Sequence, residues 1–250
     1  MVKLAQLVDY LDTLLEVEQI EDYCPNGLQI EGRDDVERLV CGVTASQQLI
    51  DHAIAVNAAA ILVHHGYFWK GESARITGIK RKRIGALLAN DISLLGYHLP
   101  LDLHPVHGNN VQLARVLDWQ PDPVSEGTRP PLLRTASLER DWQGDELAGH
   151  LSARLQRTPL HIPAPRSIRR VAWCTGGAQG YIEQAVELGV DAYVTGEVSE
   201  QTVHVARENG IHFFAAGHHA TERYGAKALG EHVAAKFAVE CEFVDLDNPA

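Results

Sequence analysis

Short apolar segments alternate with helix-length segments along this chain of 250 residues. Apolar segments of about five residues, separated by helices of about ten, are typical of a parallel sheet with helices on both faces. The sequence therefore predicts an α/β fold with mainly parallel sheets covered by helices, in three layers. The expected strands are 39–44, 59–63, 92–97, 171–175, 191–195 and 211–216.

A proline-rich segment divides the chain into two halves of similar length. The stretch Gln120–Pro131 contains four prolines and one glycine, a composition that does not belong inside a regular element. We therefore predict an N-terminal lobe over 1–120, a linker over 121–131 and a C-terminal lobe over 132–250. Whether the final helix and strand pack on the first lobe stays open at this stage.

The two halves resemble one another, which indicates a worn duplication and two similar α/β lobes. Each half has three expected strands with helices between them. Aligning the last strand of each half pairs His98 with His218 and Asp102 with Glu222. On this alignment each half ends a strand with a histidine that is followed, four residues later, by a carboxylate.

The amino-acid composition limits the cellular compartment and the binding partners that we expect for this protein. Acidic residues outnumber basic ones by 33 to 22, and the net charge of -11 argues against nucleic acid as the main partner. The four cysteines form no C-x-x-C pair, which suits a reducing compartment. No apolar run approaches the ~18 to 20 residues that span a bilayer. We therefore expect a soluble, cytoplasmic protein that has no membrane partner.

Histidines and carboxylates follow three of the expected strands. Because parallel strands end at one edge of a sheet, we expect these side chains to meet there. Three imidazoles and two carboxylates exceed the three protein ligands of a typical catalytic zinc, and suit two ions ~3.5 to 4 Å apart. The sequence therefore predicts a pair of divalent ions. The expected ligands are His64, His65, Asp102, His218 and Glu222.

The donor set leaves the metal identity open, since mixed nitrogen and oxygen ligands admit Zn, Fe, Mn, Ni, or Mg in one position. Two residues near these ligands are candidates for proton transfer. His98 follows the strand 92–97, and we expect it to orient a ligand or move a proton rather than bind metal directly. Glu197 follows 191–195 and is the second catalytic candidate, with Glu200 as its alternative.

Three further segments can be interpreted either as ligand-binding features or as structural ones. Phe68 and Trp69 could stack on a base, or they could form a lid or a subunit contact. The basic run Lys80–Arg83 could bind a ligand, although a solvated helix face is the simpler reading. The segment Thr175–Gly180 could hold an anion on its backbone amides, but it lacks the lysine of a P-loop.

Several segments together resemble a known family over essentially the whole chain. They are Asp22–Gln29, Val63–Gly66, His98–Asp102, Gly108–Asn110 and Gly217–Glu222. In these the sequence is similar to the GTP cyclohydrolase I type 2 homologues, also called the NGG-interacting-factor-three-like family. The resemblance implies a dinuclear metal centre with the five ligands above. It also implies a homo-oligomer, a toroidal hexamer built as a trimer of dimers.

Two functions remain as hypotheses. The leading one is a dinuclear metal-dependent hydrolase that uses activated water on GTP or a related small nucleotide. The alternative is a non-catalytic metal-binding ring that serves as a scaffold with a regulatory, nucleic-acid or protein-docking role. The sequence by itself does not name the substrate.

Overall fold

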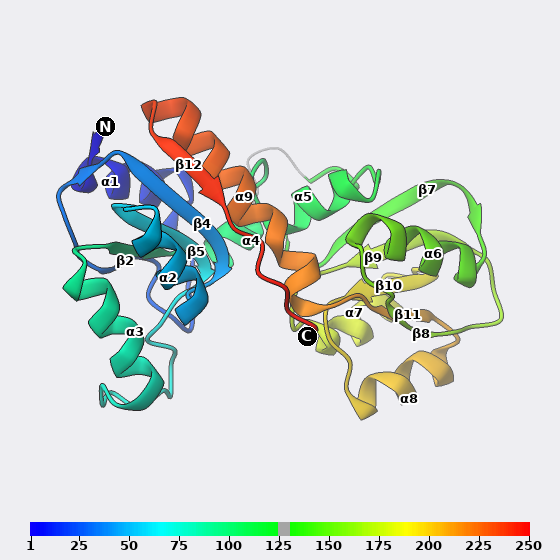
Figure 1. The fold of residues 1–250 in the computed structure, drawn as a ribbon. Helices are drawn as coiled ribbons and strands as arrows, with labels where there is room; N and C mark the ends of the chain where they lie inside the picture. Colours follow the sequence, from blue (N-terminus) through cyan, green and yellow to red (C-terminus); the bar gives the residue numbers. More distant parts are fainter. Residues whose placement is uncertain (125–130) are drawn as a thin grey trace. The chain divides into compact units, whose positions relative to one another are not determined.

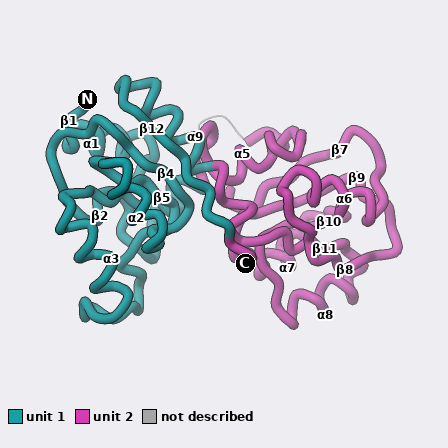
Figure 2. The backbone as a smooth tube through the Cα atoms, in the orientation of Figure 1, with its two compact units in different colours: residues 1–102, 225–247 teal, residues 103–224, 248–250 magenta. Residues whose placement is uncertain are grey.

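The first two crossings of the chain between its two folded units fall within regular helices rather than in the expected linker. A computed structural model describes residues 1–124 and 131–250, which form two units (Figure 2). Unit 1 comprises Met1–Asp102 and Gly225–Asp247, and unit 2 comprises Leu103–Tyr224 and Asn248–Ala250. The positions 125–130 of the expected linker lie outside the described residues.

This division differs from the predicted lobes 1–120 and 132–250, for a reason that lies in the cores. Helix α5 (Asn109–Val116) places Leu113 in one apolar cluster with Leu147 and Trp173, so the segment after Asp102 belongs to unit 2. At the other end, the last strand of the chain joins the sheet of unit 1. The proline-rich segment therefore lies after the point at which the second unit begins.

Unit 1 is built on a five-stranded sheet (Figure 1). The first four strands in spatial order are parallel, and the fifth is antiparallel to its neighbour. In that order the strands are β12 (Glu240–Phe243), β4 (Arg38–Thr44), β5 (Ala60–His65), β6 (Ser93–Gly96) and β2 (Gly27–Ile30). The predicted strands 39–44, 59–63 and 92–97 are confirmed as β4, β5 and β6.

Two apolar clusters fill the two faces of this sheet. Successive residues of β4 alternate between them: Leu39 and Cys41 belong to one cluster and Val40 to the other, as the two-residue period of a strand requires. The helices that contribute are α1 (Leu4–Leu14) and α9 (His218–Phe237) to the first cluster, and α2 (Gln47–Ala55) and α3 (Gly78–Ala89) to the second. A short ladder of β1 (Val2–Lys3) and β3 (Asp35–Val36) completes the unit.

Unit 2 has a mixed sheet whose central strands are parallel. Its two edge strands are antiparallel to their neighbours, so the expected mainly parallel arrangement holds only for the centre. In spatial order the strands are β7 (Arg134–Trp142), β9 (Ile168–Trp173), β10 (Ala192–Thr195), β11 (His212–Ala215) and β8 (Leu160–Ile162). The remaining helices are α6 (Gly144–Leu155), α7 (Ile182–Glu187) and α8 (Glu200–Asn209), with the short α4 (Leu99–Leu103) at the boundary.

The two units repeat one plan. In each sheet three consecutive parallel strands lie side by side, and an antiparallel strand flanks the last of them. This agrees with the predicted pair of similar α/β lobes. Within the described residues, no helix is both long and apolar enough to cross a membrane.

The backbone register corrects the predicted alignment of the two halves by one residue. The amide of Tyr97 donates to the carbonyl of Val63, and the amide of Ala216 donates in the same way to that of Thr195. His98 is therefore equivalent to Gly217 rather than to His218, and by the same count Asp102 corresponds to Thr221 rather than to Glu222. The common spacing of histidine and carboxylate concealed this slip, because only the strand hydrogen bonds report the register.

Candidate metal centre

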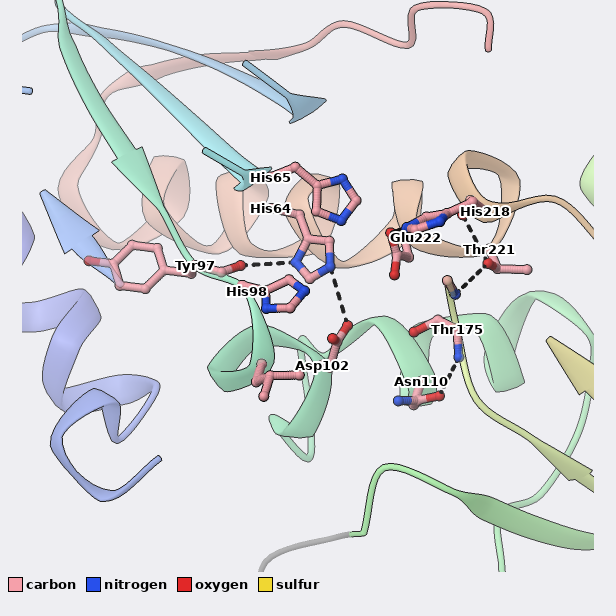
Figure 3. Close-up of polar contacts among 12 residues, drawn as sticks. His64, His65, Tyr97, His98, Asp102, Asn110, Thr175, His218, Thr221 and Glu222 are labelled. Atoms are coloured by element: carbon pink, nitrogen blue, oxygen red, sulfur yellow. Dashed lines mark hydrogen bonds and ion pairs between the residues drawn. The ribbon is translucent and has the colours of Figure 1, made fainter. Parts of the chain in front are cut away.

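In unit 1, His64 is held in one tautomer and faces a carboxylate. Its side chain is fully buried, and Nδ1 lies 3.0 Å from the main-chain oxygen of Tyr97 (Figure 3). A carbonyl oxygen only accepts, so Nδ1 carries the proton and Nε2 is the electron-pair donor of the neutral ring. Nε2 lies 3.6 Å from Oδ1 of Asp102. Two electron-pair donors that face each other at this distance are suited to bind one cation between them as its ligands.

Asp102 is positioned by a short helix of which it is itself a part. Helix α4 begins directly after β6, and the Asp102 amide donates to the His98 carbonyl at 3.1 Å. Pro100 fits the first turn because an amide proton is not needed there. The helix places the buried carboxylate of Asp102 towards His64.

Three imidazoles gather at the ends of β5 and β6. The ring centroid of His64 lies 4.5 Å from that of His65 and 5.0 Å from that of His98. Each ring offers a nitrogen within 4.8 Å of the others, a spacing that allows joint binding of one ion. His65 is also held from the neighbouring strand, since its Nδ1 lies 3.2 Å from the hydroxyl oxygen of Thr44.

Asp22 orients His98, a role that no pattern in the sequence indicates. Its carboxylate accepts from Nδ1 of His98 at 3.0 Å, from the side-chain amide of Asn26 at 3.0 Å and from the amide of Leu99 at 2.9 Å. Burial acts most strongly on the pKa of Asp22 and raises it, but these hydrogen bonds together outweigh burial and lower the pKa. The residue therefore stays ionised and leaves Nε2 of His98 as the reactive nitrogen.

Asp22, Cys24 and His98 also lie close enough together to form a group of possible metal ligands. Two observations argue against that role. The Asp22 carboxylate already accepts the hydrogen bonds described above, and burial raises the pKa of the Cys24 thiol to about 12. A thiol binds metal as the thiolate, which this environment disfavours. We therefore read the group as a support for His98.

In unit 2, His218 lies between two carboxylates. Gly217 has a φ of +101°, which lets the chain turn sharply between β11 and α9. His218 Nε2 lies 3.0 Å from Oε2 of Glu222, one helical turn further on, and Nδ1 lies 2.7 Å from Oε1 of Glu197. Burial, the largest single effect, lowers the pKa of His218, but the two carboxylates outweigh it and raise the pKa to about 9.

A glycine makes the space that Glu222 and His218 occupy. A Cβ atom on Gly176 would collide with the Glu222 carboxylate and would lie 3.2 Å from Nε2 of His218. Gly176 also has a φ of +68°, and its amide donates to the hydroxyl of Thr221 at 3.0 Å. Gly176 thus packs against the carboxylate, and its amide is not available for the anion that the sequence suggested.

The structure brings the predicted site residues together within each unit. Unit 1 collects His64, His65, His98 and Asp102, and unit 2 collects Glu197, His218 and Glu222. Two further histidines near Asp102, His104 and His107, lie in a local turn, in which Nδ1 of His104 accepts from the His107 amide at 2.9 Å. Imidazole and carboxylate donors of this kind fit Zn, Fe, Mn or Ni, and do not select among them.

Comparison with known proteins identifies the family. The family model described as Duf34/NIF3 (NGG1p interacting factor 3) matches residues 2–249. The chain belongs to the Duf34/NIF3 family. This Duf34/NIF3 chain is 57% identical over 250 residues to a Pseudomonas aeruginosa protein named GTP cyclohydrolase 1 type 2 homolog, covering 100% of the chain and 99% of that relative. An Escherichia coli K12 relative of the same name is 51% identical over 250 residues, covering 99% and 100%.

A solved structure has the same fold as this Duf34/NIF3 chain. The structure of protein ybgI matches with a TM-score of 0.95 and 50% sequence identity, and covers 100% of both chains. The function of protein ybgI is described as unknown. The family and fold are therefore shown, whereas the relatives' names carry the word homolog and do not by themselves assign a reaction.

Proposed function

We propose that this Duf34/NIF3 protein binds two divalent metal ions and hydrolyses a small nucleotide, with GTP as the best single candidate. The proposed ligands are His64, His65 and Asp102 of unit 1 together with His218 and Glu222 of unit 2. The observation that carries the proposal is the pair of His64 and Asp102. The Tyr97 carbonyl holds the His64 ring so that Nε2 faces a buried carboxylate, as a metal ligand requires.

The chain's own residues supply positioning and proton transfer. Bound divalent ions would act as Lewis acids that activate water and polarise a carbonyl, amidine or phosphoryl group. His98 is the first proposed proton carrier, because Asp22 fixes its Nδ1–H and leaves Nε2 to accept or return a proton. Glu197 is the second, and its contact with Nδ1 of His218 also fixes that ring.

The nucleotide class rests on the family and on the aromatic surroundings of His98. Relatives at 51% and 57% identity carry the name GTP cyclohydrolase 1 type 2 homolog. Trp69 lies beside His98, with 5.0 Å between ring centroids. We further propose that the protein assembles as a homo-hexamer and acts in the cytoplasm. The scattered spacing of its four cysteines, which form no C-x-x-C pair, suits a reducing compartment.

Metal analysis of the purified protein, combined with a GTP-turnover assay, tests the proposal. We expect about two ions per chain and metal-dependent turnover, both reduced in His64→Ala and in Glu222→Ala. His204→Ala is the matched control, because this histidine lies exposed on α8 and is not among the proposed ligands. Full metal content and activity in both ligand variants would refute the ligand set. Two ions without turnover would favour the non-catalytic scaffold.

A further inference from the structure

Two aromatic side chains form a wall beside the imidazoles of unit 1. The rings of Tyr23 and His98 make a T-shaped contact, at 5.0 Å between centroids and 67° between planes. The ring of Trp69 approaches His98 in the same manner, at 5.0 Å and 85°. Tyr23 and Trp69 also contact each other, with centroids 6.1 Å apart. We call this pair the aromatic wall.

The aromatic wall lies beside the proposed metal ligands and is also exposed to solvent. The ring centroid of Trp69 lies 6.0 Å from that of His65. Tyr23 is 52% exposed, although a tyrosine can bury a large apolar area and usually does so in a core. A half-exposed aromatic side chain beside a group of imidazoles is suited to stack on a planar ligand.

The two loops that carry the wall are tied together by main-chain contacts. The amide of Lys70 donates to the carbonyl of Tyr23 at 2.6 Å. Gln29 spans both loops, because its side chain accepts from the Tyr67 amide at 2.7 Å and donates to the Pro25 carbonyl at 2.7 Å. The wall is therefore fixed in place before any ligand arrives.

A glycine pair leaves the room that Gln29 needs. A Cβ atom on Gly66 or on Gly96 would lie against the amide group of Gln29, at 2.7 Å from its Cδ atom in the first case and 3.1 Å in the second. A second polar tie holds Trp69, since its amide donates to Glu72 at 3.1 Å and Glu72 pairs with Lys80 at 3.1 Å. These contacts give Lys80 of the basic run a structural role.

We propose that Tyr23 and Trp69 bind a planar heteroaromatic ring of the substrate and set the specificity for it. This inference rests on the proposed function, because it places the ring of a nucleotide-like substrate beside the proposed metal ligands. Stacking on an aromatic face tolerates any planar base and strengthens binding on the order of tenfold. A sugar phosphate without a base has no such contact. The wall therefore discriminates by the ring and not by the phosphate.

The test compares two probes on the metal-loaded protein by isothermal titration calorimetry. Guanosine 5′-monophosphate carries a purine ring, and ribose 5-phosphate lacks it. We expect the wild type to bind the purine nucleotide at least tenfold more tightly than the sugar phosphate. Trp69→Ala should lose this preference, Tyr23→Ala should weaken it, and Trp69→Phe should retain most of it. Binding of ribose 5-phosphate should stay unchanged in all three variants.

Metal content, measured on each variant, separates this inference from the proposed function. A wild type that prefers the purine nucleotide but retains no metal after the loading step would refute the proposed metal centre and would still support ring binding by the wall. Equal binding of the two probes by the wild type, or a full purine preference in Trp69→Ala, would overturn the proposal that the aromatic wall binds the ring of the substrate. An equal weakening of binding to both probes in Trp69→Ala would also overturn it, because the purine preference would then persist without the Trp69 ring.

Discussion

The Glu197 carboxylate lies 2.7 Å from Nδ1 of His218, and Glu222 lies 3.0 Å from Nε2 of the same ring. In the metal-free protein both contacts favour the imidazolium and raise the pKa of His218 to about 9. The stability that this raised pKa provides is present below the ordinary value of 6.5 and is lost as the pH rises through about 9. A metal ion that binds His218 has to displace the proton that the two carboxylates hold on this imidazolium.

Glu197→Gln should lower the pKa of His218 in the metal-free protein. The substitution keeps the shape of the side chain and removes one of the two negative charges that stabilise the imidazolium. A titration of the His218 ring by NMR, after removal of metal with a chelator, measures the shift. Glu200→Gln is the control on the exposed start of α8. A pKa of His218 that is the same in both variants would contradict this account.

Gly176→Ala should destabilise unit 2 and reduce metal binding. The added Cβ collides with the Glu222 carboxylate, and the φ of +68° disfavours any side chain, which together cost about 1 to 3 kcal/mol. Urea unfolding and metal stoichiometry after reconstitution with Zn²⁺ measure the two effects. Gly180→Ala is the matched control, since a Cβ there meets nothing within 4 Å. Wild-type metal binding by Gly176→Ala would show that the position of Glu222 does not matter.

Asp22→Asn should destabilise unit 1 in a pH-dependent manner. The ionised carboxylate accepts from His98, Asn26 and Leu99, and its loss should cost about 1 to 3 kcal/mol at neutral pH. The pKa of Asp22 is lowered in the folded state, so its stabilisation is present above the ordinary value of 3.8 and is lost as the pH falls further. Urea unfolding at a series of pH values should show the two proteins converging in acid. The exposed neighbour Glu21→Gln should behave like wild type.

Gly230→Ala should strain the contact of α9 with the sheet of unit 1. A Cβ atom there would collide with the Cys41 thiol and lie 2.9 Å from Sγ of Cys241, and overpacking of this kind costs about 1 to 3 kcal/mol. The double variant with Cys41→Ala should recover part of the loss, because it removes the colliding atom. Gly85→Ala on α3 meets nothing within 4 Å and should raise stability instead. Thermal unfolding of the four proteins tests this coupling.

The central strands and the metal-ligand candidates were predictable because they carry local signals. The strand 59–63 is a continuous apolar segment that precedes His64 and His65, and β5 confirms it. The spacing of His218 and Glu222 equals one helical turn, and their side chains meet at 3.0 Å. Periodicity and spacing report such features without knowledge of the rest of the fold.

The edge strands and the supporting residues required tertiary information. β8 has three residues, and it pairs with β11 far along the chain, so no pattern of its own reveals it. Asp22 lies in an irregular segment, and its role depends on a contact with His98, 76 residues away. The one-residue slip between the halves appeared only in the backbone hydrogen bonds. Long-range pairing decides each of these features, and a single sequence does not report it.

The return of β12 to β4 affects the order in which the units can fold during synthesis. β4 is a strongly apolar strand, and one of its edges finds its partner only in residues 240–243, after Leu103–Tyr224 of unit 2 have been translated. All five strands of the unit 2 sheet leave the ribosome before that partner does. The unit that starts first is therefore completed last, and until then the nascent chain presents an open strand edge that a chaperone or a neighbouring chain can pair with.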